Sequence, residues 1–116
     1  MCTSIIVPAY NSANVLSECV TALKLSACDN TEIIVVDDGS RDGTALVAAE
    51  MGVRLVTLVV NSGPAVARNC GARHAQGEIL LFVDADVVLT PGTLKRIEKT
   101  FQEHPEIAAV FGSYDA

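Results

Sequence analysis

The chain lacks the features that mark a disulfide-rich, zinc-binding or membrane-spanning protein. Its four cysteines include no Cys-x-x-Cys pair and no histidine at metal-ligand spacing, so neither a disulfide framework nor a zinc site is predicted. No apolar run reaches the roughly 18 residues that cross a bilayer. The N-terminal stretch also lacks the basic flank and long apolar segment of a signal peptide. We therefore expect a cytoplasmic location, or the cytoplasmic face of a membrane.

Positive charge is scarce as well. The 116 residues include 8 Lys or Arg and 14 Asp or Glu, which gives a formal net charge of -6. Sequence-independent binding to nucleic acid needs basic side chains that neutralise phosphates, so nucleic acid is not an expected partner. An anionic small ligand would need a local cation, a helix N-terminus or a metal ion to offset the charge of the protein.

Apolar residues, by contrast, make up 50% of the chain, which excludes a disordered protein. The length fits one domain over residues 1–116, with no repeat, low-complexity segment or linker. For a complete enzyme with two substrates, such a domain is small.

Short runs rich in β-branched residues alternate with helical patterns along the chain. The apolar residues of these runs are continuous rather than alternating with polar ones, as in strands that are buried on both faces of a sheet. This alternation predicts an α/β fold, with a mostly parallel, Rossmann-like sheet and helices on both faces. The expected strands span residues 4–10, 32–38, 53–60, 78–85 and 107–113.

Capping residues define four expected helices between these strands. Ser, Asn, Asp and Thr favour the N-cap, Pro favours the first helical turn, and Gly favours the position after the last turn. The residues assigned to these roles are Asn11 or Ser12 for the first helix, Asp42 and Gly52 for the second, Pro64 and Gly77 for the third, and Thr90 and Pro91 for the fourth.

Polar residues follow the expected strands. In an open parallel sheet, ligands bind outside the carboxyl ends of the strands, at the point where the strand order reverses. Because these ends meet at one edge of the sheet, we expect the residues that follow them to form a single site. They are Pro8-Ala9-Tyr10-Asn11, Asp37-Asp38-Gly39-Ser40, Asn61-Ser62-Gly63-Pro64 and Asp84-Ala85-Asp86.

The adjacent carboxylates of Asp37 and Asp38 have two interpretations. Asp, Gly and Ser are ordinary turn residues, so this segment can be a plain turn after a strand. A turn needs only one Asp, however, and two adjacent carboxylates repel each other. In the second interpretation, one of them accepts a hydrogen bond from an N–H or hydroxyl group of a ligand.

Asp84 and Asp86 stand inside the apolar run LLFVDADVVL. An unpaired charge is costly to bury, and a period of two places both side chains on the same side of an extended segment. Carboxylate oxygens are the ligands that Mg²⁺ and Mn²⁺ prefer, commonly together with substrate phosphates. A divalent ion held here would neutralise the pair. The alternative is a solvated strand end without a metal.

The helix that begins near Pro64 supplies positive charge. Its free backbone N–H groups make its N-terminus a candidate anion site, and Arg68, about one turn in, can reach a diphosphate. Tyr10, at a strand end, can stack on a nucleobase, and a position in the core is the alternative.

Four segments of the chain together resemble the family 2 glycosyltransferases, which have the GT-A fold. In order they are SIIVPAYN, EIIVVDDGSRDGT, GPAVARNCGARHAQGEILLFVDADV and FQEHPEIAAVFGSYD, and they cover residues 4–115. The resemblance implies an enzyme that binds a nucleotide-diphospho-sugar through Mg²⁺ or Mn²⁺. It also implies inverting transfer of the sugar to an acceptor hydroxyl, the acceptor being a saccharide or a lipid-linked molecule.

The resemblance implies roles for individual residues. The end of the first strand, with Tyr10, would contact the nucleoside, and Asp38 with Asp37 would bind the base. Asp84 would approach the ribose or sugar, while Asp86 would bind the metal on the diphosphate. The predicted nucleotide-binding residues are Pro8, Ala9, Tyr10, Asp37, Asp38, Gly39, Ser40, Arg68, Asp84, Ala85 and Asp86, with Asp84 and Asp86 as metal ligands.

The chain departs from the family pattern in its length. Family members continue into a second half that supplies the acceptor site and the carboxylate base, and no residue here matches that base. We therefore expect the donor-binding half of an enzyme, inactive by itself and self-associating through the strand at 107–113. The alternative is a non-catalytic nucleotide-binding or interaction module.

Three other classes of protein fit the sequence less well. A nucleotidyltransferase of similar fold has a Gly-rich, basic loop after the first strand, and PAYNSAN contains no Gly, Lys or Arg. A phosphoacceptor receiver domain has its acidic pair after the first strand, whereas the pair here follows the second. A dinucleotide-binding domain needs a G-x-G-x-x-G motif, which the chain lacks.

Overall fold

The computed structural model describes residues 2–104, which form a parallel sheet in the strand order β3-β2-β1-β4. This arrangement confirms the predicted α/β class and the parallel sheet. The expected strand at 107–113 lies outside the described residues. The strands are β1 (Thr3–Ala9), β2 (Thr31–Asp38), β3 (Arg54–Leu58) and β4 (Ile79–Phe82).

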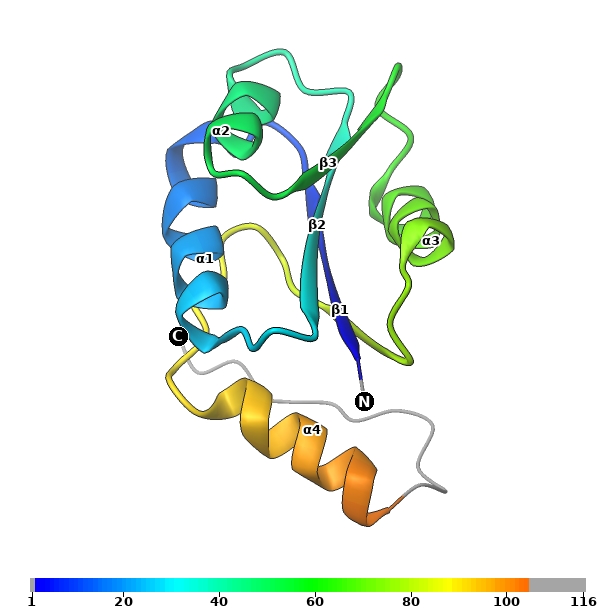
Figure 1. Ribbon diagram of the computed structural model, residues 1–116. Coiled ribbons are helices and arrows are strands. Elements are labelled where there is room, and N and C mark those ends of the chain that lie inside the picture. Colours follow the sequence, from blue (N-terminus) through cyan, green and yellow to red (C-terminus); the bar gives the residue numbers. More distant parts are fainter. Residues whose placement is uncertain (1, 105–116) are drawn as a thin grey trace.

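Helices cover both faces of the sheet, as predicted. Helices α1 and α2 lie on one face and α3 lies on the other, while α4 packs beside α1 (Figure 1). No helix within residues 2–104 is long and apolar enough to cross a membrane. The helices are α1 (Ala13–Ser26), α2 (Thr44–Glu50), α3 (Pro64–His74) and α4 (Thr93–Glu103).

Two apolar clusters, one on each face, hold these layers together. The larger contains one face of α1, on which Leu16, Cys19 and Leu23 are fully buried. On the other face, α3 approaches β1 so closely that a Cβ on Gly71 would lie 2.4 Å from Cγ2 of Ile6. Each fully buried Leu or Ile contributes roughly 1.5–3 kcal/mol to stability, so these contacts fix the strands that carry the edge residues.

Two helix boundaries differ from the prediction. The fourth helix begins at Thr93 rather than at Pro91, because Gly92 has a φ of 87° and left-handed backbone cannot continue a helix. The third helix ends at His74 rather than at Gly77. Beyond it, the Gln76 N–H donates to Glu32 and the Gly77 N–H donates to Ser4 Oγ, and these bonds draw the chain toward the sheet.

Two other helix signals are confirmed. Gly52 follows α2 with a φ of 72°, a conformation that favours glycine just beyond a helix end. Pro64 occupies the first turn of α3, where its missing N–H costs nothing. These signals are local, and tertiary contacts do not override them.

Candidate functional site

The carboxyl ends of the strands meet at the upper edge of the sheet in Figure 1. The chain runs from β1 outward to β2 and β3 on one side, and then places β4 on the other side of β1. Ligands of open α/β sheets bind at such a reversal. The register pairs Ala9 with Asp37, so the residues after β1 and β2 start level with each other. The predicted convergence of the strand ends at one edge is confirmed.

Hydrogen bonds join the loops that follow β1 and β2. The Asn11 N–H donates to Ser40 Oγ over 2.9 Å, and Asn11 Oδ1 accepts from the Arg41 N–H, also over 2.9 Å. Asn11 has a φ of 47°, which turns the chain abruptly after the strand. Tyr10 consequently stands outside the core with 47% of its surface exposed. A core position for this ring, the alternative left open by the sequence, is excluded.

The start of α1 is capped from another loop. Ser12, one of the two predicted residues, occupies the N-cap position of α1, but its side chain makes no capping bond and that of Asn11 binds elsewhere. Instead, the Ser12 N–H donates to Thr44 Oγ1 over 2.8 Å and the Ala13 N–H donates to Asp42 Oδ2 over 3.2 Å. Asp42 Oδ1 also accepts from the Thr44 N–H over 3.0 Å, but the N-cap of α2 is Gly43 rather than the predicted Asp42. Asp42 thus serves both helices.

The carboxylate of Asp38 is buried and accepts three hydrogen bonds from the loop after β3. It is 3% exposed. Its Oδ1 accepts from the Ser62 N–H over 2.7 Å, and its Oδ2 accepts from the Gly63 N–H over 2.9 Å and from Asn61 Nδ2 over 3.1 Å. The N-terminus of α3 was expected to bind an anion of the ligand. Asp38 accepts from N–H groups that precede the first residue of α3, so this expectation stays a prediction.

Gly39 explains how the loop after β3 comes so close. Its φ is 69°, and a Cβ at this position would lie 2.5 Å from the backbone nitrogen of Asn61. Only glycine therefore lets the turn after β2 pack against the loop that delivers its donors to Asp38.

Asp37 differs from its neighbour Asp38. It is 6% exposed, and its Oδ1 accepts from the Ser40 N–H over 3.1 Å. Its Oδ2 accepts no hydrogen bond from the part of the chain that the structure describes. Every buried side-chain nitrogen or oxygen in that part has a partner, so Oδ2 must retain contact with solvent. Of the two carboxylates, Asp37 is the one that can accept a hydrogen bond from outside.

The acidic pair after β4 lies in a turn. The strand was expected to extend through residue 85, but it ends at Phe82, and the Val87 N–H closes a turn on the Asp84 carbonyl over 3.0 Å. Burial nevertheless alternates, with the neighbours of Asp84 at positions 83 and 85 inside and both Asp84 and Asp86 outside. The two carboxylates share the solvent side, and neither charge is buried in the apolar run.

Arg68 reaches the acidic turn from the second turn of α3. Its Nη2 lies 3.6 Å from Asp84 Oδ1, and the two side chains are 41% and 56% exposed. An exposed pair of this kind contributes about 0–1 kcal/mol, so either partner can exchange it for a ligand.

Below the turn, desolvation and the negative charges of Asp86 and Asp84 raise the pKa of the buried Cys19 thiol to about 11.

The donor set suits a cation that shares its ligands with a substrate. Within residues 2–104, no group of three or more His, Cys, Asp or Glu side chains is placed to hold a metal. Asp84 and Asp86 offer exposed carboxylate oxygens only, the ligand type that Mg²⁺ and Mn²⁺ accept. Both ions usually keep water or substrate phosphate in the remaining positions. The pair fits such an ion.

The comparison with known proteins agrees with this geometry. Residues 4–116 match the family model described as glycosyl transferase family 2. The chain belongs to this family. Glycosyltransferase GlyG of Streptococcus pneumoniae is 33% identical over 116 residues, an alignment that covers 96% of this chain and 38% of GlyG. The relatives are named as enzymes, and the chain spans less than half the length of GlyG.

Solved structures place the family 2 domain in the GT-A fold. S. aureus TarS in complex with UDP-GlcNAc superimposes with a TM-score of 0.84 at 34% identity, over 90% of this chain and 32% of that one. The mannosyltransferase PcManGT of Pyrobaculum calidifontis, in complex with GDP-Man and Mn²⁺, gives 0.78 at 30% identity, over 85% and 32%. The predicted family and fold are both confirmed.

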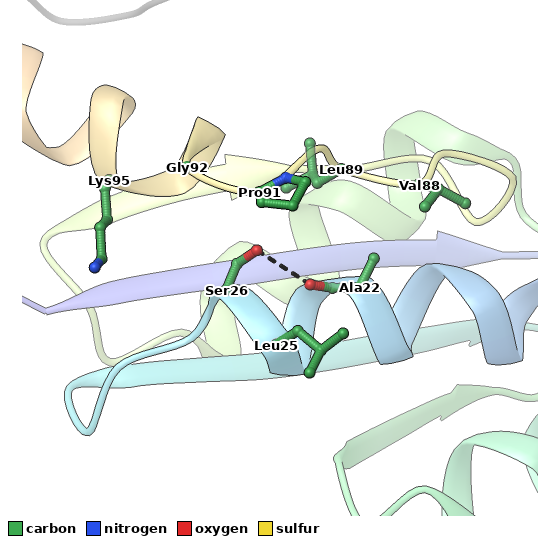
Figure 2. Close-up of a pocket in the computed structure, with 8 residues that line it drawn as sticks. All are labelled: Ala22, Leu25, Ser26, Val88, Leu89, Pro91, Gly92 and Lys95. Carbon is green, nitrogen blue, oxygen red and sulfur yellow. Dashed lines mark hydrogen bonds between the residues drawn. The ribbon is translucent and has the colours of Figure 1, made fainter.

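A hollow of about 480 Å³ lies elsewhere in the family 2 domain, between α1 and the segment leading into α4 (Figure 2). Its lining is apolar except for Ser26 and Lys95, and it contains none of the predicted nucleotide-binding residues. A diphosphate would find one cation there and no carboxylate to share a metal. The carboxyl edge therefore remains the candidate site.

The sequence did not predict the hydrogen bonds that hold together the loops at the site of the family 2 domain. It assigned Asp42 to a single helix and gave no role to Thr44, and it did not pair Asn61 with Asp38. The signal was present, because these residues all follow strand ends that were expected to converge. Which of them bond depends on how closely the loops approach, and that distance is a tertiary property.

Proposed function

We propose that this domain binds a nucleotide-diphospho-sugar donor at its carboxyl edge, for inverting transfer of the sugar to an acceptor hydroxyl. One observation carries the proposal: the exposed Tyr10, the unbonded oxygen of Asp37 and the carboxylates of Asp84 and Asp86 lie at the carboxyl ends of β1, β2 and β4, the strands at and next to the reversal. The TarS structure contains UDP-GlcNAc and the PcManGT structure contains GDP-Man and Mn²⁺, which supports a donor of this class.

The nucleoside end of the donor lies against the loops after β1 and β2. Tyr10 offers an exposed ring on which a base can stack. We assign the hydrogen bond to the base to Asp37 rather than Asp38, because the oxygens of Asp38 already hold the loop after β3. The residues that complete this end of the proposed site are Pro8, Ala9, Gly39 and Ser40.

The diphosphate end lies at the acidic turn. Asp86, together with Asp84, would hold Mg²⁺ or Mn²⁺, and Ala85 between them anchors the turn in the core. When bound, such an ion stabilises the departing diphosphate as a Lewis acid. Arg68 would exchange Asp84 for a phosphate oxygen, which keeps its charge paired in both states.

Completion of the transfer needs a base that deprotonates the acceptor hydroxyl. The family resemblance assigns this base, and the acceptor site, to the part of the longer relatives that this chain does not span. The proposed acceptor is a saccharide or a lipid-linked molecule. The cytoplasmic location expected from the sequence also stays a prediction.

Calorimetric titration with nucleoside diphosphates in the presence of Mn²⁺ tests the proposed function. A panel that includes UDP and GDP is used because TarS is solved with UDP and PcManGT with GDP-Man. We expect one member to bind, and to bind more tightly with Mn²⁺ than with a chelator. Absence of binding by every member, with the fold intact, would favour the alternative of a non-catalytic interaction module.

Asp37→Ala is expected to weaken nucleotide binding by about 1–3 kcal/mol, the cost of a lost hydrogen bond to a charged group. The loss should be the same with Mn²⁺ and with a chelator, because Asp37 faces the base and not the metal. Calorimetry on the variant measures it. Asp29→Ala, an exposed carboxylate between α1 and β2, is the matched control and should bind as the original chain does. An unchanged affinity in Asp37→Ala would exclude the base contact.

We also propose self-association through the C-terminal edge of the sheet. The expected strand at 107–113 is outside the described residues. Among the described strands, β4 is at one edge of the sheet, and its Leu80 and Phe82 are 40% and 38% exposed. An apolar sheet edge readily pairs with a second copy. Sedimentation across a concentration series should reveal a dimer that Leu80→Lys weakens. A monomer at every concentration would mean that the edge is covered within the chain.

A further inference from the structure

We propose that Asp42 is a positioning residue that locks the loop after β1 to the loop after β2 and so fixes the separation of Tyr10 and Asp37. The inference rests on the proposed nucleoside end of the site. Asp42 is exposed, so it does not stand at this position for packing. What it contributes is a pair of carboxylate oxygens between two loops.

The two oxygens of Asp42 serve different loops. Oδ1 accepts from the N–H and the hydroxyl of Thr44, the first residue of α2, whereas Oδ2 accepts from the Ala13 N–H at the start of α1. Holding the start of α2 would need only the first oxygen. The second bond spans 29 residues of sequence and joins the element that follows Tyr10.

Asp42 acts within a continuous row of contacts. Three successive N–H groups, those of Asn11, Ser12 and Ala13, all donate to side chains of the loop after β2. One acceptor, Thr44 Oγ1, also donates to Asp42, so the carboxylate orients the hydroxyl that receives the Ser12 N–H. Asp42 therefore supports two of the three bonds, one directly and one through Thr44, which is fully buried.

Electrostatics favours the same arrangement. The negative charge of Asp42 stands at the N-termini of both α1 and α2, where the helix dipoles stabilise an anion. The hydrogen bond from the Thr44 hydroxyl, followed by those from the backbone N–H groups of Thr44 and Ala13, outweighs desolvation and holds the pKa of Asp42 below its ordinary value. The contact is thus formed by the charged carboxylate throughout the neutral pH range.

The consequence concerns recognition of the nucleoside. Tyr10 immediately precedes the locked segment, and Asp37 is held by Ser40, whose hydroxyl accepts from Asn11. A base that stacks on Tyr10 while donating to Asp37 needs the two loops to be held at a fixed separation. Loosening the lock should therefore weaken nucleotide binding without touching the acidic turn at Asp84.

Asp42→Asn isolates the lock. With its carbonyl oxygen at Thr44, the new amide presents NH₂ to the Ala13 N–H, so the bond between the loops is lost while the cap of α2 is kept. Thr44→Val removes the linking hydroxyl, and Thr44→Ser restores it. Asp29→Asn, an exposed change between α1 and β2, is the matched control. All variants are compared at a temperature where each is folded.

Two readouts are measured on each variant. Amide hydrogen exchange at Ala13 reports the lock itself, and titration with UDP and GDP, each with Mn²⁺ and with a chelator, reports its effect on the site. In Asp42→Asn and Thr44→Val we expect faster exchange at the start of α1 and a nucleotide affinity lower by about three- to tenfold. The ratio of the affinities with and without metal should not change, and Thr44→Ser should bind as the original chain does.

Each contrary result has a distinct meaning. Unchanged nucleotide affinity in Asp42→Asn, despite faster exchange at Ala13, would overturn the positioning role and leave the proposed function standing. A change in the metal ratio would overturn it as well, because the lock would then act on the acidic turn. If the original chain binds neither UDP nor GDP nor any other nucleoside diphosphate, the proposed function fails first, and the role of Asp42 fails with it.

Discussion

Asp86→Ala is expected to abolish the dependence of nucleotide binding on metal. The protein carries a net charge of -6, so a bare diphosphate is repelled, and an ion at the acidic turn would reverse that repulsion locally. Loss of a group that merely orients a metal ligand lowers metal affinity by about 10–100-fold, and loss of a ligand itself should cost at least as much. In calorimetric titrations, the variant should bind nucleotide with the same low affinity whether Mn²⁺ or a chelator is present.

The control for this experiment is Asp29→Ala, which removes the same charge from an exposed position between α1 and β2. It should retain the full metal dependence, and this result separates a metal ligand from a general effect of net charge. If the original chain binds nucleotide equally well with Mn²⁺ and with a chelator, the metal role of Asp84 and Asp86 is wrong. Removal of Asp86 would then reveal nothing further about it.

Asp38→Ala is expected to destabilise the fold rather than act mainly on binding. The change leaves the N–H groups of Ser62 and Gly63 without their acceptor, while Asn61 Nδ2 keeps only its bond to the Asp38 carbonyl. Net contributions of hydrogen bonds to a charged group are about 1.5–3 kcal/mol each, and water can reach some of these donors after the change. We therefore expect the free energy of unfolding to fall by roughly 3 kcal/mol, measured by urea denaturation.

Asp37→Ala provides the comparison for Asp38→Ala, since it removes a neighbouring carboxylate that makes one bond within the described residues. Asp37→Ala should lose far less stability than Asp38→Ala. Its loss of nucleotide affinity should be larger than its small effect on folding can explain. An Asp38→Ala variant as stable as the original chain would contradict the anchoring role. In that case, the assignment of the base contact to Asp37 would lose its physical basis.

The sheet could be predicted because its information is local. Runs such as SIIVPAY and EIIVVDD contain continuous rather than alternating apolar residues, as strands buried on both faces require, and the observed β1 and β2 begin and end within one residue of the expectation. The helix boundaries marked by Pro64 and Gly52 are equally local signals. The edge that carries the site then follows from the parallel arrangement.

The division of labour between Asp37 and Asp38 could not be predicted in the same way. Adjacent residues of a strand point to opposite faces, but which carboxylate meets the loop after β3 depends on how closely that loop passes Gly39. The acidic turn is a similar case. The strand ends at Phe82, and the Val87 N–H closes a turn on the Asp84 carbonyl. The apolar run LLFVDADVVL does not indicate where the strand gives way to this turn.

The most direct test of the central claim is to locate the bound nucleotide. NMR chemical-shift mapping suits a chain of 12.2 kDa, with the tightest nucleoside diphosphate of the panel added in the presence of Mg²⁺. The account predicts shifts at the carboxyl edge, around Tyr10, Ser40 and Asp86, and unchanged signals at Lys95 in the hollow beside α1. Shifts confined to the hollow, or none at any residue, would contradict it.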